Sequence, residues 1–197
     1  MSIDAIRARL AVRERHVWPS KKQAAVLVPL IDDGRGPLRL LLTRRTESIN
    51  HAGQVAFPGG RADPEDLDIV HTALREAREE VALPPERVEV LGLLDDIPAK
   101  DMRTLVTPVV GVVRDLPPLR PSPAEVARIF DIPLPALRVR DGWVTKERPD
   151  STGRKWPLHF FDWDGETLWG LSAYITLQLL SLTPDGTPIR LPPPYDR

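Results

Sequence analysis

A run of apolar residues at helical spacing follows directly on a glycine-rich bend in this sequence. The bend at 58–60 interrupts a short apolar strand at 54–57, and its glycines allow the backbone to approach a ligand closely. Asp63 and the proline after it form a helix-start signal, and Pro84 ends the pattern. The apolar positions recur at intervals of three and four residues, which predicts a helix with one face packed on a sheet: Leu67, Val70, Leu74, Ala77 and Val81.

Short apolar runs between turn residues predict several strands around this helix. The first two are expected to form a hairpin across a turn at 34–37, and Pro108 favours an edge position or a bulge in a later strand. Strands interleaved with helices indicate the α/β class, a sandwich with a mixed β-sheet between helical layers. The predicted strands are 24–31, 38–46, 54–57, 88–94, 105–113 and 158–163, and further helices lie within 1–20 and at about 124–130 and 168–182.

The length of 197 residues suits one domain. We expect it to span 1–197, with a helical N-terminal extension at 1–20 and a proline-rich tail at 184–197. No internal repeat divides the chain.

The composition argues against several classes of function. Basic and acidic residues nearly balance, 27 against 28, so no broad positive field would hold nucleic acid or an anionic membrane. The absence of cysteine removes thiolate metal sites and cysteine nucleophiles. The first 20 residues lack the apolar centre of a signal peptide, so the cytoplasm is the expected compartment. Their arginines leave a mitochondrial presequence as the alternative, against which Asp4 and Glu14 argue.

Three glutamates lie on the predicted helix opposite its apolar stripe. At about 100° per residue, Glu76, Glu79 and Glu80 converge on one solvent-facing patch. Like charges four residues apart repel each other, so a cation is expected beside them. Carboxylate oxygens suit hard cations such as Mg²⁺ or Mn²⁺, and Arg75 can orient Glu79. An ordinary solvated helix face is the alternative interpretation.

Bend and helix together resemble the signature of the Nudix family, a strand-loop-helix unit in which a glycine and a glutamate precede Arg-Glu-aliphatic-x-Glu-Glu. Residues 75–80 match the second part, and Gly60 matches the glycine. The intervening loop is one residue longer than in the general signature, and Ala82 replaces a later glycine. Either Glu65 or Asp66 takes the place of the first glutamate.

The segments upstream of the bend are similar to the coenzyme A pyrophosphatase branch of that family. Leu-Leu-Thr-Arg-Arg at 41–45 and Gly-Gln-Val-Ala-Phe-Pro-Gly-Gly at 53–60 match two motifs of the branch. Thr46 and Asn50 stand where the branch has a small residue and an arginine, with one residue fewer between the motifs. The resemblance covers about residues 24–180.

This resemblance implies a Nudix-like fold and metal-dependent hydrolysis of the diphosphate bond of coenzyme A or acyl-coenzyme A. The products would be 4'-phosphopantetheine, or its acyl form, and adenosine 3',5'-bisphosphate. The alternatives are hydrolysis of another nucleoside diphosphate derivative, such as a dinucleotide, ADP-ribose or a nucleotide sugar, and a Nudix-fold ligand-binding module without turnover. Homodimers are frequent in the family, so self-association is a further expectation.

The resemblance also implies roles for individual residues. Glu76, Glu79, Glu80 and the Gly60 carbonyl would hold Mg²⁺ or Mn²⁺ ions, and Arg75 would position the carboxylates.

The residue that accepts the proton of the attacking water would be Glu125 or Glu76, and an exposed helix-start residue is the alternative for Glu125. A structural ion pair is the alternative for Arg45. The residues expected to contact the substrate are Arg44, Arg45, Gly59 and Gly60.

Overall fold

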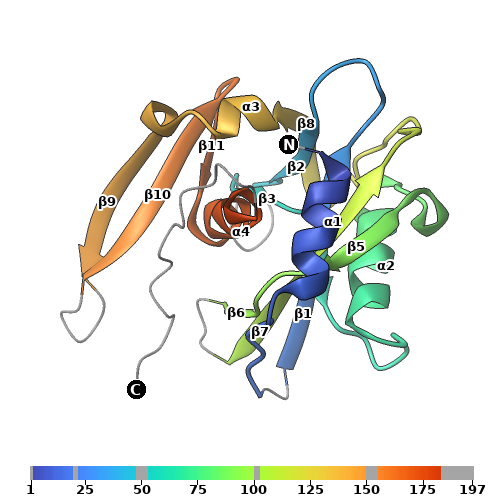
Figure 1. Ribbon diagram of the computed structural model, residues 1–197. Coiled ribbons are helices and arrows are strands. Elements are labelled where there is room, and N and C mark those ends of the chain that lie inside the picture. Colours follow the sequence, from blue (N-terminus) through green and yellow to red (C-terminus); the bar gives the residue numbers. More distant parts are fainter. Residues whose placement is uncertain (1, 20–21, 48–52, 100–102, 150–154, 183–197) are drawn as a thin grey trace.

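The computed structural model describes residues 2–19, 22–47, 53–99, 103–149 and 155–182; Asn50 and the tail at 184–197 lie outside these ranges. Within them, eight strands form one mixed sheet and three form a smaller one (Figure 1). The large sheet consists of β1 (Lys22–Ile31), β2 (Arg39–Arg45), β3 (Val55–Ala56), β4 (Gly59–Arg61), β5 (Glu89–Leu93), β6 (Ile97–Pro98), β7 (Thr104–Val113) and β8 (Val126–Pro133).

Strand β1 organises the large sheet because it pairs on both sides. On one side it runs parallel to β7 along its whole length. On the other side it pairs antiparallel with β4 near its start and with β2 at its end. Strand β2 also pairs with β3 and β8, while β5 and β6 pair with β7. The mixed sheet and the first hairpin are therefore confirmed.

Helices cover both faces of the large sheet (Figure 1). Helix α2 (Ile69–Val81) packs on one face in a cluster that includes Leu27 and Val109. Helices α1 (Ile3–Val12) and α4 (Gly170–Ser181) pack on the other face in the larger cluster. Eight residues of α4 are buried because this helix lies between the two sheets. This arrangement is the predicted α/β/α sandwich.

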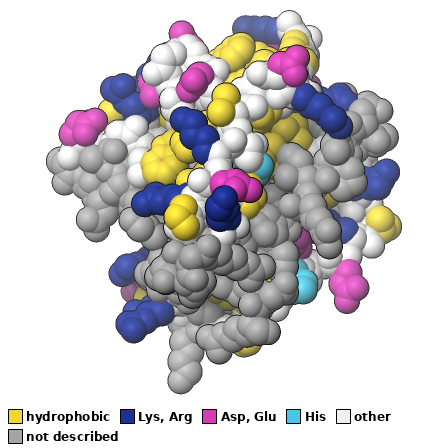
Figure 2. All heavy atoms as spheres, turned by 90° about the vertical axis from the view of Figure 1, so that its left-hand side faces the viewer, with side chains coloured by type: hydrophobic (Ala, Val, Ile, Leu, Met, Phe, Trp, Pro, Cys, Tyr) yellow, Lys and Arg dark blue, Asp and Glu magenta, His cyan; other side chains and the backbone are white. Residues whose placement is uncertain are grey.

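The small sheet has the order β11-β10-β9 and comprises β9 (Trp143–Pro149), β10 (Lys155–Trp163) and β11 (Glu166–Trp169). Phe161 and Leu168 point into the core, whereas Val144 is 52% exposed on the outer face and Lys146 lies over the Phe160 ring. Figure 2 views this side of the molecule and shows hydrophobic and basic side chains interspersed. The remaining elements are α3 (Leu134–Leu137) and single 3₁₀ turns at Pro85–Arg87 and Arg140–Gly142.

The glutamate-bearing helix begins later than the sequence suggests. The prediction of a start at Asp63 is wrong, because Asp68 is the N-cap and its carboxylate accepts from the His71 N–H at 2.7 Å. Asp63 instead closes a turn with Asp66. Leu67 consequently lies outside the helix and is 88% exposed, so it is not part of the packed stripe. The end of the helix before Pro84 is confirmed.

Of two further predictions from proline-containing segments, the helix is wrong, and for Pro108 the edge position is wrong whereas the bulge is present: the five residues 93–97 lie opposite the four residues 106–109. Residues 126–133 form strand β8 along β2 rather than a helix at 124–130, because pairing along the edge of β2 overrides a weak local helical preference. Pro108 lies in β7 between β1 and β5 rather than at an edge. Its carbonyl accepts from Leu94 where the pairing passes from β5 to β6, so its missing N–H faces a break in that ladder.

The N-terminal extension is tied to the sheet by arginine–carboxylate pairs. After α1, Arg13 pairs with Asp95 at 2.6 Å and Arg15 pairs with the buried Asp96. Asp96 also accepts from the Thr107 hydroxyl at 2.6 Å. The extension is therefore a structural part of the fold over its described residues. None of the described helices has both the length and the apolar character needed to cross a membrane.

Candidate active site

The candidate site lies where α2 crosses strand β4 and the end of β2. Glu80 on α2 accepts from the Gly59 N–H at 3.3 Å and lies 3.7 Å from the Arg45 guanidinium on β2. Glu76, one turn earlier, faces Gly60. The structure thus brings Glu76, Glu80, Arg45 and the two glycines together, as the sequence predicts.

Both glycines are required by close packing. A Cβ at Gly59 would collide with the backbone of β1 at Ala25, and a Cβ at Gly60 would collide with the Glu76 carboxylate. Gly59 and Gly60 form a regular strand with β1 and neither has a positive φ, so the expected bend is an extended segment. The missing side chain of Gly60 leaves room for the Glu76 carboxylate, and the missing side chain of Gly59 lets this strand lie against the β1 backbone.

Arg75 holds several acidic groups in place. Its guanidinium binds both carboxylate oxygens of Asp66, at 2.9 and 3.0 Å. It also donates to Glu76 at 3.0 Å and to Glu79 at 3.1 Å. The Asp66 side chain is 3% exposed, and the bond from Arg75 holds the pKa of this carboxyl well below its usual range. Of the two candidates for the first family glutamate, the structure therefore brings Asp66 and not Glu65 to Arg75.

Glu80 is buried rather than solvent-facing, which corrects the expectation of an exposed patch. The residue is 3% exposed. Burial raises the pKa of Glu80 to about 8, against the opposing effects of Arg45 and the Gly59 N–H. The negative charges of Glu125 and Glu76 raise it further. The Arg45 guanidinium at 3.7 Å therefore does not offset the burial of this carboxylate.

Glu76 and Glu79 differ in their exposure. The Glu76 side chain is 15% exposed and that of Glu79 is 57% exposed. Burial raises the pKa of Glu76. Arg75 lowers this pKa, whereas the negative charges of Glu79 and Glu125 raise it further. Glu79 turns towards Arg75, as predicted, and so stands apart from the pair formed by Glu76 and Glu80.

Glu125 reaches the same region from the loop before β8. It is exposed and not at a helix start, and its backbone carbonyl accepts from the Thr46 N–H at 2.9 Å. The loop is fixed to α2 because the Ser122 N–H donates to the Glu80 carbonyl at 2.8 Å. The negative charge of Glu125 raises the pKa values of Glu76 and Glu80, so Glu125 interacts electrostatically with the site.

The carboxylate oxygens of the site suit a hard cation, although the side chains are not arranged around a common cation position. Within the ranges that the structure describes, no three acidic or histidine side chains surround a common point. Glu76 and Glu80, however, are carboxylates whose pKa values are raised by burial and by neighbouring negative charges, so a cation between them would relieve both effects. Glu79 would have to leave Arg75, and water or phosphate oxygens would complete the shell.

The two neighbouring arginines of β2 point to opposite faces of the sheet. Arg45 faces α2, whereas Arg44 lies 3.6 Å from the buried Glu166 of β11, which also binds Arg128. The structure thus places Arg44 outside the site, as an ion-pair partner between the two sheets. The Nε atoms of Arg44 and Arg45 are buried without a hydrogen-bond partner in the described part of the chain. Glu166 was not singled out from the sequence as a partner of Arg44. The alternation of side chains along a strand is the signal that could have shown that Arg44 and Arg45 face opposite sides of the sheet.

Comparisons with known proteins show the family of this chain. A family model for the NUDIX domain matches residues 21–162. The Nudix hydrolase NudL of Photorhabdus laumondii is 39% identical over 181 residues, covering 90% of this chain and 93% of the relative. NudL of Pectobacterium atrosepticum is 44% identical over 163 residues, with 81% of each chain covered. Nudix hydrolase 15, mitochondrial, of Arabidopsis thaliana is 36% identical over 85% of this chain and 60% of its own length.

Solved structures support the fold. RenU, a Nudix hydrolase from M. smegmatis, aligns with a TM-score of 0.51 at 20% identity, covering 63% of this chain and 76% of its own. A MutT/nudix family protein from Enterococcus faecalis aligns with a TM-score of 0.54 at 17% identity, covering 92% and 69%. With the family match and relatives of similar length, these findings establish that the chain belongs to the Nudix hydrolase family and is a pyrophosphohydrolase.

Proposed function

We propose that this Nudix hydrolase cleaves the diphosphate bond of coenzyme A or acyl-coenzyme A. The products are 4'-phosphopantetheine, or its acyl form, and adenosine 3',5'-bisphosphate. One observation carries the proposal: the two segments similar to coenzyme A pyrophosphatases meet at the candidate site. The Arg45 N–H donates to the Gln54 carbonyl at 3.0 Å, and the following glycines adjoin Glu76 and Glu80.

Nudix hydrolases generally use divalent metal ions, and we propose Mg²⁺ or Mn²⁺ for this one. Glu76, Glu79, Glu80 and the Gly60 carbonyl are the proposed ligands. Bound there, the ions would lower the pKa of a water molecule and polarise the phosphate under attack. Oxygen ligands favour these hard cations over zinc, and the chain has no cysteine.

The chain's own residues bind the substrate and move the proton. Arg45 is the proposed phosphate ligand, because its guanidinium is only loosely paired with Glu80 at 3.7 Å. The Gly59 N–H already donates to Glu80, so this amide supports the carboxylate first. Water oxygen bonds to phosphorus as the anhydride P–O bond breaks, and Glu125 or Glu76 accepts the proton of that water.

The proposed setting for this activity is the cytoplasm. Association into a homodimer is part of the proposal, while nucleic acid is not a proposed partner. The Arabidopsis relative is named as mitochondrial, so localisation of a full-length fluorescent fusion would test this point.

A substrate panel tests the proposal. Purified protein with Mg²⁺ or Mn²⁺ is incubated with coenzyme A, NADH, ADP-ribose and a diadenosine polyphosphate, and the products are identified by mass. Faster cleavage of coenzyme A, with both expected products, supports the proposal. Faster cleavage of another nucleotide would favour a different nucleoside diphosphate derivative, and no cleavage would favour a binding module. Protein with Glu80→Gln serves as the control for contaminating activity.

A further inference from the structure

Two arginines and two carboxylates form an ion-pair cluster between the large and the small sheet. Arg44 of β2 and Arg128 of β8 are Cα partners, so their side chains lie on the same face of the large sheet. Glu166 of β11 accepts from Arg128 at 3.0 Å and lies 3.6 Å from Arg44. Asp164, in the turn before β11, also binds Arg128. These four side chains, called the Glu166 cluster below, join the small sheet to β2 and β8.

The charge balance of the Glu166 cluster depends on one buried group. Like charges directly opposite each other on neighbouring strands destabilise the pairing of those strands, and Arg44 and Arg128 are such a pair. The Glu166 side chain is 7% exposed and contacts both arginines, whereas that of Asp164 is 67% exposed and contacts Arg128. Glu166 is therefore the acidic partner of Arg44 among the described residues. Loss of its charge would leave the Arg44 guanidinium beside another guanidinium without a counter-charge.

The Glu166 cluster lies one residue before the candidate site along β2. Arg45 follows Arg44 and faces α2 on the other side of the sheet. Between these two residues the register with β8 shifts, since Arg44 pairs with Arg128 but Arg45 pairs with Val126. A bulge of this kind disrupts the hydrogen-bond ladder locally. The pair formed by Arg44 and Arg128 is thus the last regular pair of β2 and β8 before Arg45.

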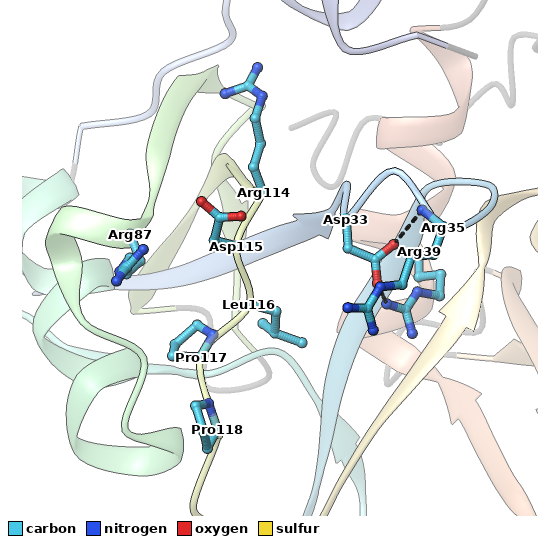
Figure 3. Close-up of a pocket in the computed structure, with 9 residues that line it drawn as sticks. All are labelled: Asp33, Arg35, Arg39, Arg87, Arg114, Asp115, Leu116, Pro117 and Pro118. Atoms are coloured by element: carbon cyan, nitrogen blue, oxygen red, sulfur yellow. Dashed lines mark hydrogen bonds and ion pairs between the residues drawn. The ribbon is translucent and has the colours of Figure 1, made fainter.

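The opposite end of β2 carries an arginine whose charge is balanced differently. Arg39 binds Asp33 at 2.8 Å and Asp131 at 3.1 Å. Figure 3 shows Arg39 beside Asp33 at the edge of a pocket of about 650 Å³. When one of these carboxylates is removed, the other still neutralises the arginine. This ion pair lies about 20 Å from Arg45 on the same strand, so it provides a control for the Glu166 cluster.

We propose that Glu166 is a positioning residue for binding of the substrate phosphate. By neutralising Arg44, it keeps β2 paired with β8 up to the bulge and so fixes the direction of the Arg45 guanidinium. The inference rests on the proposed function, in which Arg45 binds that phosphate. The small sheet thereby takes part in substrate binding, acting through β2 rather than by contact with the substrate.

The substitution Glu166→Gln tests the charge alone, because glutamine keeps the shape of the side chain. We expect KM for coenzyme A to rise about fivefold with kcat unchanged within about twofold, as weakened substrate binding predicts. The effect is smaller than that of removing Arg45, because the guanidinium is displaced and not lost. Glu125 should keep its place, since the Ser122 N–H of the same loop donates to the Glu80 carbonyl at 2.8 Å.

A double variant shows whether Glu166 acts through Arg44. Arg44→Gln alone leaves Glu166 paired with Arg128, so KM should not change. Arg44→Gln combined with Glu166→Gln removes both charges and should return KM to within about twofold of the wild-type value, because the two residues are coupled. A glutamate that only stabilised the fold would lower Tm without changing KM. Asp33→Asn, at the other end of β2, is the matched control and should leave KM unchanged.

Hydrogen–deuterium exchange tests the positioning step without turnover. The Arg45 N–H donates to the Gln54 carbonyl at 3.0 Å, and the Thr46 N–H donates to the Glu125 carbonyl at 2.9 Å. In EDTA, both amides should exchange faster in Glu166→Gln than in the wild type, because the strand end that carries them is less well held. They should exchange at the wild-type rate in the double variant and in the control.

The outcomes separate this inference from the proposed function. A rise in KM that the double variant reverses, with faster exchange at Arg45, supports the positioning role. An unchanged KM in Glu166→Gln, a rise that the double variant does not reverse, or an equal rise in Asp33→Asn would overturn it. Should Glu166→Gln not fold, a wild-type KM in the double variant supports the role and a raised KM overturns it. Cleavage of another nucleotide instead of coenzyme A would overturn the proposed function alone, and the same variants are then compared with that nucleotide.

Discussion

Replacing Glu80 by glutamine should stabilise the metal-free protein while abolishing catalysis. In the folded chain burial raises the pKa of Glu80 to about 8, whereas the ordinary value is 4.5. The folded protein therefore binds a proton that the unfolded chain has lost between these two pH values, and stability falls as pH rises through this window. Below pH 4.5 both states are protonated and the penalty is absent.

The size of the stability penalty follows from the difference between the pKa of Glu80 in the folded and in the unfolded chain. Each pKa unit corresponds to about 1.4 kcal/mol, so the penalty reaches about 3 kcal/mol at pH 7 and about 5 kcal/mol above pH 8. Glutamine keeps the shape of Glu80 and can still accept from the Gly59 N–H, but it carries no charge. For a chain of this size, 3 kcal/mol corresponds to a rise in Tm of roughly 6–12 °C.

The assay is thermal or urea unfolding of both proteins in EDTA from pH 4.5 to 9. The curves should coincide at the acidic end and diverge with rising pH, the variant being more stable. Added Mg²⁺ should raise the Tm of the wild type more than that of the variant, since a cation relieves the same penalty. Glu79→Gln is the control, because the Glu79 side chain is 57% exposed. Parallel curves for wild type and Glu80→Gln would refute the reasoning.

Four further substitutions address the rest of the site. Glu79→Gln should leave the Tm unchanged but lower kcat by orders of magnitude, measured with saturating Mg²⁺, as loss of a metal ligand predicts; full activity would remove Glu79 from the site. Asp66→Asn breaks a partly buried pair with Arg75 and should lower the free energy of unfolding by about 1–3 kcal/mol in urea at pH 7. Because the pKa of Asp66 is lowered on folding, the wild type should lose this advantage as pH falls below 4, and a constant difference would contradict the ion pair. Arg45→Ala should raise KM for coenzyme A at least tenfold, whereas Arg44→Ala should lower Tm with KM unchanged; equal effects on KM would contradict the assignment of the two arginines to opposite faces.

The large elements of the fold were predictable because their signals are periodic and local. The apolar runs of β1, β2 and β7 specify buried strands, and α4 is apolar nearly all round because sheets cover it on two sides. Elements that form only because they pair with another strand were not predictable in this way. Strand β8 forms because β2 offers an unpaired edge, and nothing in residues 126–133 alone states this.

The start of α2 shows how local signals compete. Asp63 and Asp68 are both suitable N-caps, and the first is followed by a proline that favours a helical first turn. Tertiary contacts decide between them: Asp66 must leave the helical path to bind Arg75 with both oxygens. The longer loop between Gly60 and Arg75 makes room for this turn, so the helix begins at Ile69.

The burial of Glu80 could have been inferred from its angular position. On the helix it lies about 100° from the centre of the apolar stripe, at the border between the buried and exposed faces. Where a helix packs on an ordinary strand, the strand's side chains keep the two backbones apart, so a residue at this border of the helix is exposed. Gly60 has no side chain on the face towards α2, and the Gly59 N–H donates to Glu80, so backbone covers this border of the helix.

This arrangement couples metal binding to the protonation of Glu80 in the folded protein. At neutral pH the metal-free protein lowers the cost of burying Glu80 by keeping its carboxyl protonated. A metal ligand must be deprotonated, so a cation that binds Glu80 displaces that proton and its apparent affinity increases with pH up to about 8. The glycine strand therefore does more than make space for a ligand. By removing water from one carboxylate of α2, it gives the site a stronger attraction for a divalent cation than three glutamates on a solvated helix would have.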